Sequence, residues 1–122
     1  MLTNKRSRRK ASGGRYRPTT KRIVNRSNLA TNTKLGESRV KTERTRGGGV
    51  KGKMLATNKV NVFDGKKSSI TEITNVIETP ANRHLVRRNV LTKGAIVETK
   101  MGKVKITSRP GQESSVNGVL VK

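Results

Sequence analysis

The sequence contains no cysteine and a single histidine, His84. The absence of cysteine excludes a disulfide framework and every metal site built from thiolates. One imidazole cannot complete a zinc site of His and Cys ligands, and no Ser-His-Asp set is supported beyond coincidence. The acids after residue 53 are single and widely spaced, without the paired carboxylates of an acid–base site. We therefore expect no bound metal, no cofactor and no enzymatic activity.

Aromatic side chains are equally scarce, because Tyr16 and Phe63 are the only two. RNA-recognition sheets and single-strand-binding barrels stack bases on several aromatic rings. Two rings far apart in the sequence argue against such a stacking platform. We expect any nucleic acid to be bound through its phosphates and sugars.

Long apolar runs are absent, since the longest, such as residues 95–97 and 119–121, have three residues. A bilayer-spanning helix needs about 20 apolar residues. The basic start, residues 1–11, is followed by Ser, Gly and Arg where a signal peptide would have its apolar segment. The sequence thus predicts a soluble chain with no membrane partner. Residues 1–36 have the basic, acid-free composition of an organelle transit peptide, but glycines and a proline interrupt any amphipathic helix there.

Positive charge is abundant and concentrated at the front of the chain, within a net charge of +22. Residues 1–53 hold 17 Lys or Arg and 2 acids, and residues 54–122 hold 12 basic and 5 acidic side chains. So few carboxylates cannot neutralise the front segment, which indicates a polyanionic partner.

The large apolar side chains show the opposite distribution. Val, Ile, Leu, Met and Phe number 8 in residues 1–53 and 22 in residues 54–122. We therefore expect two parts. Residues 1–53 form a basic extension that binds a polyanion and is disordered when free, and residues 54–122 form a body with a small hydrophobic core.

Residues 54–122 have the pattern of short strands separated by turns. Residues 59–63 alternate and end at an Asp-Gly pair suited to a tight hairpin turn. Residues 69–78 are rich in β-branched side chains, which favour strand over the helix that a capping-box spacing at Ser69 and Glu72 would allow. After a turn at residues 80–82 the extended pattern resumes. The remaining strands are expected at residues 84–91, 95–99, 104–107 and 116–121.

Six short strands with no helical period between them predict a mainly β fold. The expected architecture is a small antiparallel β-barrel of about six strands, with a long basic N-terminal extension.

The glycine-rich residues 47–53 have the spacing of a phosphate-binding loop. A P-loop requires Ser or Thr after its lysine, where this chain has Met54, and both nucleotide-binding glycine motifs require a following helix. Nucleotide binding is therefore the weakest alternative. The segment is better interpreted as a flexible hinge whose backbone and lysines approach a phosphate chain closely.

Arginine is frequent where planar, multidentate phosphate contacts would use it. A merely solubilising tail is the plain alternative, although such tails seldom interleave glycine and threonine with charge so regularly. A chromatin-type, DNA-coating protein would fit the composition equally well. The candidate RNA-binding residues are Arg8, Arg9, Lys10, Ser12, Gly13, Gly14, Arg15, Arg17, Lys21, Arg22, Arg26, Lys34, Arg39, Lys41, Arg44, Arg46, Gly47, Gly48, Lys51, Lys53, Arg87, Arg88 and Arg109.

Three segments resemble a known family. They are residues 9–15 (Arg-Lys-Ala-Ser-Gly-Gly-Arg), residues 33–36 with 39–48 (Thr-Lys-Leu-Gly and Arg-Val-Lys-Thr-Glu-Arg-Thr-Arg-Gly-Gly), and residues 80–89, continuing through 92–99 to 107–112. Together they resemble the archaeal and eukaryotic "e" type of small-subunit ribosomal protein number eight, in its short archaeal form. Residues 21–27 depart from the family, which usually has basic residues leading into Glu-Leu-Gly there.

The resemblance implies a β-barrel body whose N-terminal extension lies on small-subunit ribosomal RNA. We expect this RNA to be bound through both the basic extension and the barrel surface. It also implies a structural, non-enzymatic constituent of the ribosome in the cytoplasm, beside neighbouring small-subunit proteins. No cofactor, metal or small-molecule substrate would be expected.

Overall fold

The computed structural model describes residues 7, 9–17 and 29–121. The chain divides into two compact units, Met1–Ala30 and Thr31–Lys122. Four of the candidate RNA-binding residues, Arg8, Lys21, Arg22 and Arg26, lie outside the described residues. Among the described residues, no helix has the length and apolar character needed to cross a membrane.

The first unit contains a tight turn between Arg9 and Arg15, which pair as an isolated antiparallel bridge. The amide of Gly13 donates to the carbonyl of Lys10 at 3.0 Å, and the amide of Lys10 donates to that of Gly14 at 2.8 Å. Gly13 has a φ of 83°, a left-handed conformation that favours glycine. All described side chains here are exposed, so local contacts, and no buried core of described side chains, support this turn.

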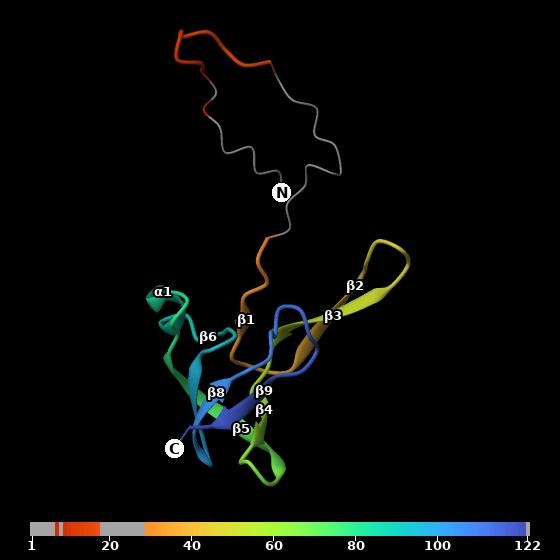
Figure 1. Cartoon of the computed structure of the whole chain (residues 1–122), viewed down its shortest axis with the longest axis vertical. Coiled ribbons are helices and arrows are strands. Elements are labelled where there is room, and N and C mark those ends of the chain that lie inside the picture. Colours follow the sequence, from red (N-terminus) through yellow and green to blue (C-terminus); the bar gives the residue numbers. More distant parts are fainter. Residues whose placement is uncertain (1–6, 8, 18–28, 122) are drawn as a thin grey trace. The chain divides into compact units, whose positions relative to one another are not determined.

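The second unit is built around a closed five-stranded barrel with the order β4-β5-β7-β8-β9 (Figure 1). Neighbouring strands are antiparallel, except that β4 and β9 close the barrel in parallel. The predicted mainly β barrel is thus confirmed, with five strands instead of about six. The strands are β4 (Lys59–Phe63), β5 (Ser68–Glu78), β7 (Ile96–Thr99), β8 (Gly102–Ile106) and β9 (Asn117–Leu120).

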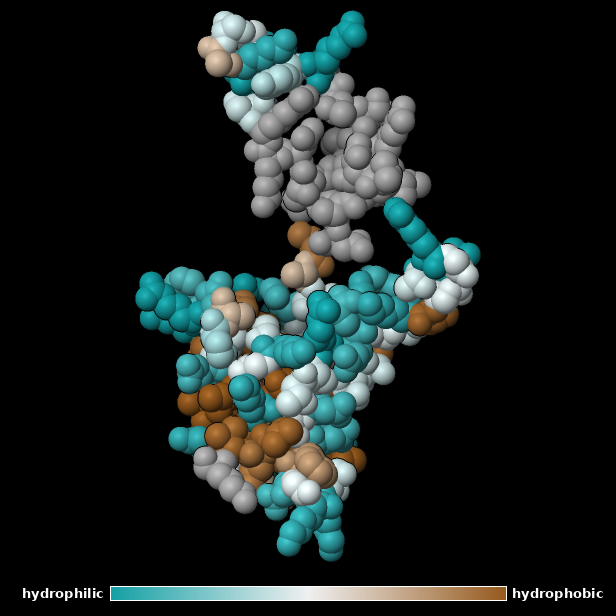
Figure 2. All heavy atoms as spheres, viewed as in Figure 1, coloured by the Kyte–Doolittle hydropathy of each residue, from teal (hydrophilic) through white to brown (hydrophobic). Residues whose placement is uncertain are grey.

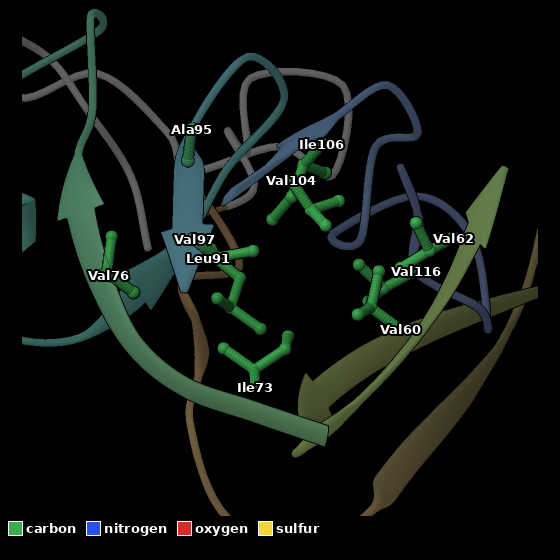
Figure 3. Close-up of a cluster of buried hydrophobic side chains, with 10 residues drawn as sticks. All are labelled: Val60, Val62, Ile73, Val76, Leu91, Ala95, Val97, Val104, Ile106 and Val116. Atoms are coloured by element: carbon green, nitrogen blue, oxygen red, sulfur yellow. The ribbon is translucent and has the colours of Figure 1, made fainter. Parts of the chain in front are cut away.

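The core fills this barrel with aliphatic side chains that gather in its interior (Figure 3). Val60 and Val62 point inward from β4, as their alternation predicts. Leu35, from outside the barrel, packs against the cluster. The buried cluster consists of Val60, Val62, Ile73, Val76, Leu91, Ala95, Val97, Val104, Ile106 and Val116.

A second, four-stranded sheet has the order β2-β3-β1-β6. Its strands are β1 (Thr33–Lys34), β2 (Arg39–Arg44), β3 (Val50–Ala56) and β6 (Val90–Leu91). Thr33 is fully buried and its hydroxyl donates to the carbonyl of Met54 at 2.6 Å. This sheet joins three separate parts of the sequence, and β3 runs across the expected domain boundary between residues 53 and 54.

The expectation that residues 84–91 form one extended strand was wrong. They contain the short helix α1 (Arg83–Val86) and then β6. The Asn82 side chain accepts a hydrogen bond from the amide of His84 at 2.9 Å, which caps the helix. Asn89 has a φ of 48° and turns the chain into β6, a conformation that asparagine tolerates better than most residues. Asn82 and Asn89 thus lie on either side of the helical turn, and Asn89 separates this turn from β6.

Candidate nucleic-acid interface

Strands β2 and β3 form a long antiparallel hairpin that projects from the rest of the second unit (Figure 1). Its closing turn is held by the amide of Thr45, which donates to the carbonyl of Gly49 at 2.7 Å. Gly47 and Gly48 have φ values of 85° and 86°. Two successive left-handed residues explain why glycine occupies both positions. The run of glycines is therefore a hairpin turn with a defined conformation.

The glycine run lacks the structural context of a nucleotide-binding loop. It is preceded by β2 and followed by β3. In P-loops and dinucleotide-binding loops the glycines open a helix, whose N-terminus holds the phosphates. No helix follows directly after the glycines of this hairpin, which argues against nucleotide binding by this segment.

The tip of the hairpin is a cluster of exposed cations and backbone donors. Arg44 and Arg46 are exposed and form no ion pair with any other described residue. The amides of Arg46 and Gly47 likewise have no hydrogen-bond acceptor within the described residues. Guanidinium groups beside uncommitted amides are the donors that bind phosphate oxygens. We call this cluster, residues 44–48, the hairpin tip.

One face of the hairpin carries lysines around a single acid. Residues directly opposite one another share a face, and Lys41 pairs with Lys53 while Glu43 pairs with Lys51. The Glu43 carboxylate lies 3.0 Å from the Lys41 ammonium and also accepts a hydrogen bond from Lys53. The hydrogen bond from Lys53, followed by that from Lys41, lowers the pKa of Glu43 below its ordinary value of 4.5.

These ion pairs divide the predicted lysines into two groups. The Lys53 side chain is only 12% exposed and is held by Glu43, whereas Lys51 forms no ion pair among the described side chains. Lys53 is therefore chiefly a structural partner of Glu43. Lys51, which is half-buried, remains available to a phosphate, whereas Lys41 is exposed but paired with Glu43.

The opposite face of the hairpin fixes its base to the loop at residues 108–116. Gly52 approaches this loop so closely that an added Cβ would lie 3.1 Å from the Cβ of Ser114. Met54 is buried, and its amide donates to the carbonyl of Pro110 at 2.9 Å. The base of the hairpin is thus anchored while its tip is exposed.

The second sheet also gathers candidate cations that are far apart in the sequence. Lys34 lies opposite Val90, two residues beyond the Arg87-Arg88 pair, and the amide of Leu35 donates to the carbonyl of Asn89 at 3.0 Å. At the other edge of the sheet, Arg39 begins β2. Arg109 opens the loop that anchors β3. Of these basic side chains, Lys34, Arg39, Arg87, Arg88 and Arg109 are all exposed.

The candidate residues of the first unit form a smaller basic turn. The ammonium of Lys10 lies over the ring of Tyr16, 5.7 Å from its centroid, a cation–π distance. The Arg9 guanidinium donates to the carbonyl of Gly13 at 3.3 Å. The basic side chains in the turn of residues 9–15 are thus all exposed. The other candidates here, Ser12, Gly14, Arg15 and Arg17, are exposed.

The sequence reasoning missed the hairpin itself. Residues 39–44 lack the apolar alternation that predicts a strand, since most of them are charged or polar. The usable signal was the glycine pair at 47–48 flanked by two basic stretches of similar length. Paired glycines between matched segments predict a hairpin turn even where the strands are polar.

Comparison with known proteins agrees with the resemblance. The sequence matches the family described as ribosomal protein S8e over residues 3–121. It is 44% identical to small ribosomal subunit protein eS8 of Methanococcus aeolicus, over 94% of this chain and 93% of the relative. It is 43% identical to the protein of the same name from Haloarcula marismortui, over the full length of both. A third such protein, from Methanococcus vannielii, is 46% identical over 94% of this chain and 93% of its own.

Proposed function

Because the chain belongs to the ribosomal protein S8e family, we propose that it is a structural, non-enzymatic component of the small ribosomal subunit that binds the RNA of that subunit. Its relatives are named small ribosomal subunit protein eS8. The expected location is the cytoplasmic ribosome, beside other small-subunit proteins. RNA would be bound by the basic extension, which includes β1, β2 and part of β3, and by the barrel surface.

The observation that best supports RNA binding is the hairpin tip. Arg44 and Arg46 are exposed on a turn whose anchored base limits the conformational entropy that binding costs. The uncommitted amides of Arg46 and Gly47 lie beside them. Phosphate contacts of this kind position a protein on RNA without reading its sequence.

Substitution of both tip arginines by alanine tests this proposal. Affinity for small-subunit ribosomal RNA should fall, because fewer counterions are released when fewer phosphates are neutralised. The slope of log affinity against log salt should become shallower by roughly 0.7 to 0.9 for each phosphate that the variant no longer binds. Fluorescence anisotropy titrations at several salt concentrations measure both quantities.

The matched control removes two exposed charges elsewhere, with Lys93→Ala and Lys103→Ala combined. This control should change the slope much less than the tip variant. Equal effects of the two double variants would mean that only net charge matters. A preference for duplex DNA over ribosomal RNA would favour the chromatin-type alternative.

A further inference from the structure

A pocket of about 460 Å³ opens on the outer wall of the barrel, over the neighbouring strands β5, β4 and β9. Figure 2 shows hydrophobic residues gathered over the barrel, while the hairpin is mostly hydrophilic. The apolar part of the lining consists of Phe63, Ile70 and Val119, which are 45%, 71% and 42% exposed. Nearly half of the Phe63 surface is thus exposed in this pocket, where it is accessible to a ligand.

The polar part of the lining includes a pair of asparagines. Asn61 and Asn117 lie opposite each other on β4 and β9, and Nδ2 of the Asn61 side chain donates to Oδ1 of the Asn117 side chain at 2.9 Å. This bond leaves the Asn61 oxygen and the Asn117 amino group without partners among the described residues. If the oxygen and nitrogen of both side-chain amides were exchanged, the hydrogen bond between them would reverse. One free acceptor and one free donor would still lie side by side. That pattern complements the hydrogen-bonding edge of a nucleobase.

The charges around the pocket suit a phosphate chain. Lys66 and Lys67 lie in the exposed turn that joins Phe63 to Ser68, together with one acid, Asp64. Lys105 is exposed on β8, where it pairs with Val119 of the pocket lining. Three lysines against one carboxylate flank a centre lined by apolar and amide groups. This arrangement matches a nucleotide, with its flat base between two phosphates.

We propose that this pocket binds one unpaired base of RNA, with the Phe63 ring against the face of the base and the Asn61–Asn117 pair at its edge. Ile70 covers the base or ribose from β5. A multi-base platform needs several aromatic rings, but a single base needs only one. The inference rests on the proposed function, since it deepens how the protein binds RNA.

The test compares two single-stranded RNA probes of equal length, one complete and one with abasic residues at its centre. Both carry the same phosphates, so purely electrostatic binding treats them alike. The full-length protein should bind the complete probe about fivefold or more tightly, the low end of the effect of one base–aromatic stack. Phe63→Leu should reduce this preference to near one and leave the salt slope unchanged.

Two further variants make the comparison specific. Ile70→Ala should also weaken the preference, whereas Ile77→Ala should leave it intact, because Ile77 is 41% exposed on the same strand but does not line the pocket. Circular dichroism establishes that each variant folds. A preference that survives both Phe63→Leu and Ile70→Ala would overturn the inference. If those variants leave RNA binding intact but prevent assembly into the subunit, the pocket binds a protein and the inference is wrong.

The outcomes also separate this inference from the proposed function. Reduced affinity in the tip variant, together with an unchanged base preference in both Phe63→Leu and Ile70→Ala, would refute base binding by the pocket but not the proposed function. Failure of the wild-type protein to bind ribosomal RNA would refute the proposed function itself.

Discussion

Single residues of the same type have opposite roles according to where the strands place them. Ile106 on β8 is 1% exposed within the core, and Ile70 on β5 is 71% exposed at the pocket. Burial of an aliphatic side chain stabilises the fold through transfer from water and through close packing that leaves no cavity. The two isoleucines therefore separate stability from binding.

We predict that Ile106→Ala lowers the free energy of unfolding by about 2 to 5 kcal/mol, the range for large-to-small changes in a close-packed core. Ile70→Ala should change it by less than about 0.5 kcal/mol, as surface substitutions usually do. Equilibrium denaturation with urea, followed by circular dichroism, measures both. Similar effects of the two variants would contradict the assignment of the barrel interior as the core.

Glu43 is a residue whose single negative charge restrains two lysines of the hairpin. Glu43→Gln should raise the affinity for ribosomal RNA, because Lys41 and part of Lys53 become available to phosphates. The salt slope should steepen by up to about one unit for each lysine that acquires a phosphate partner. The control is Glu113→Gln, an acid without an ion pair among the described residues. An affinity no higher than that of the control would contradict this role of Glu43.

The effect of Glu43→Gln on the stability of the folded protein should depend on pH. The lowered pKa of Glu43 means that its ion pairs stabilise the folded protein above the ordinary value of 4.5. That contribution disappears as the pH falls through the lowered folded-state pKa. The wild type should thus be slightly more stable than Glu43→Gln at neutral pH, and the two should converge in acid. Denaturation midpoints across a pH series check this, and a difference that grows in acid would reverse the sign.

At the scale of elements, the hairpin combines a fixed base with an exposed tip. The amides of Leu35, Met54 and Thr57 donate to carbonyls of other segments at 2.9 to 3.0 Å. At the tip, the amide of Gly48 has only a local acceptor, Thr45, at 3.3 Å. Local stability follows the density of such buried, non-local interactions.

We therefore predict a gradient of amide exchange along the hairpin in the free protein. Leu35, Met54 and Thr57 should exchange slowly with the barrel, and Thr45 and Gly48 should exchange rapidly. Binding of ribosomal RNA should slow exchange at the tip. Hydrogen exchange followed by nuclear magnetic resonance resolves the individual amides. Rapid exchange at Leu35 in the free protein would support the broader prediction that all of residues 1–53 are disordered until bound.

The elements that the sequence predicted correctly share one property, a local pattern with a single explanation. Strand β4 was predicted with its observed bounds because its valines alternate between polar residues. Strand β5 was predicted because β-branched residues fill it, and the adjoining turn occurs as a four-residue loop with Gly65 at a φ of 86°. Patterns of this kind are set by neighbouring residues alone.

The elements that were missed depend on partners far away in the sequence. The polar hairpin needs cross-strand pairing, and the two-residue strands β1 and β6 are defined by their pairing with each other. The parallel closure of β4 with β9 joins Asn61 to Asn117, at opposite ends of the barrel sequence. The sequence could not predict the pocket for the same reason, since these two asparagines meet only in the closed barrel. No local pattern contains such pairings.

In the molecule as a whole, the buried cluster and the barrel strands all lie after residue 54. All ten residues of the buried cluster lie between Val60 and Val116. The five barrel strands likewise begin at Lys59. Residues 54–122 therefore contain a complete core with its full set of barrel partners.

The preceding segment nevertheless covers part of that core. Leu35 packs against the cluster, and β1 pairs with β6, which holds the buried Val90 and Leu91. We predict that a fragment of residues 54–122 folds with the β-type circular dichroism of the barrel. It should be less stable than residues 31–122 by roughly 1.5 to 3 kcal/mol for each large aliphatic side chain that loses its cover.

Thermal and urea denaturation of the two fragments, side by side, measure this difference. A broad, non-cooperative melt of the shorter fragment would mean that β1 and the hairpin base belong to one folding unit with the barrel, because a complete small domain usually unfolds in one cooperative transition. Equal stability of the two fragments would show that the second sheet adds nothing to the fold, which would leave RNA binding as the sole reason for its basic strands.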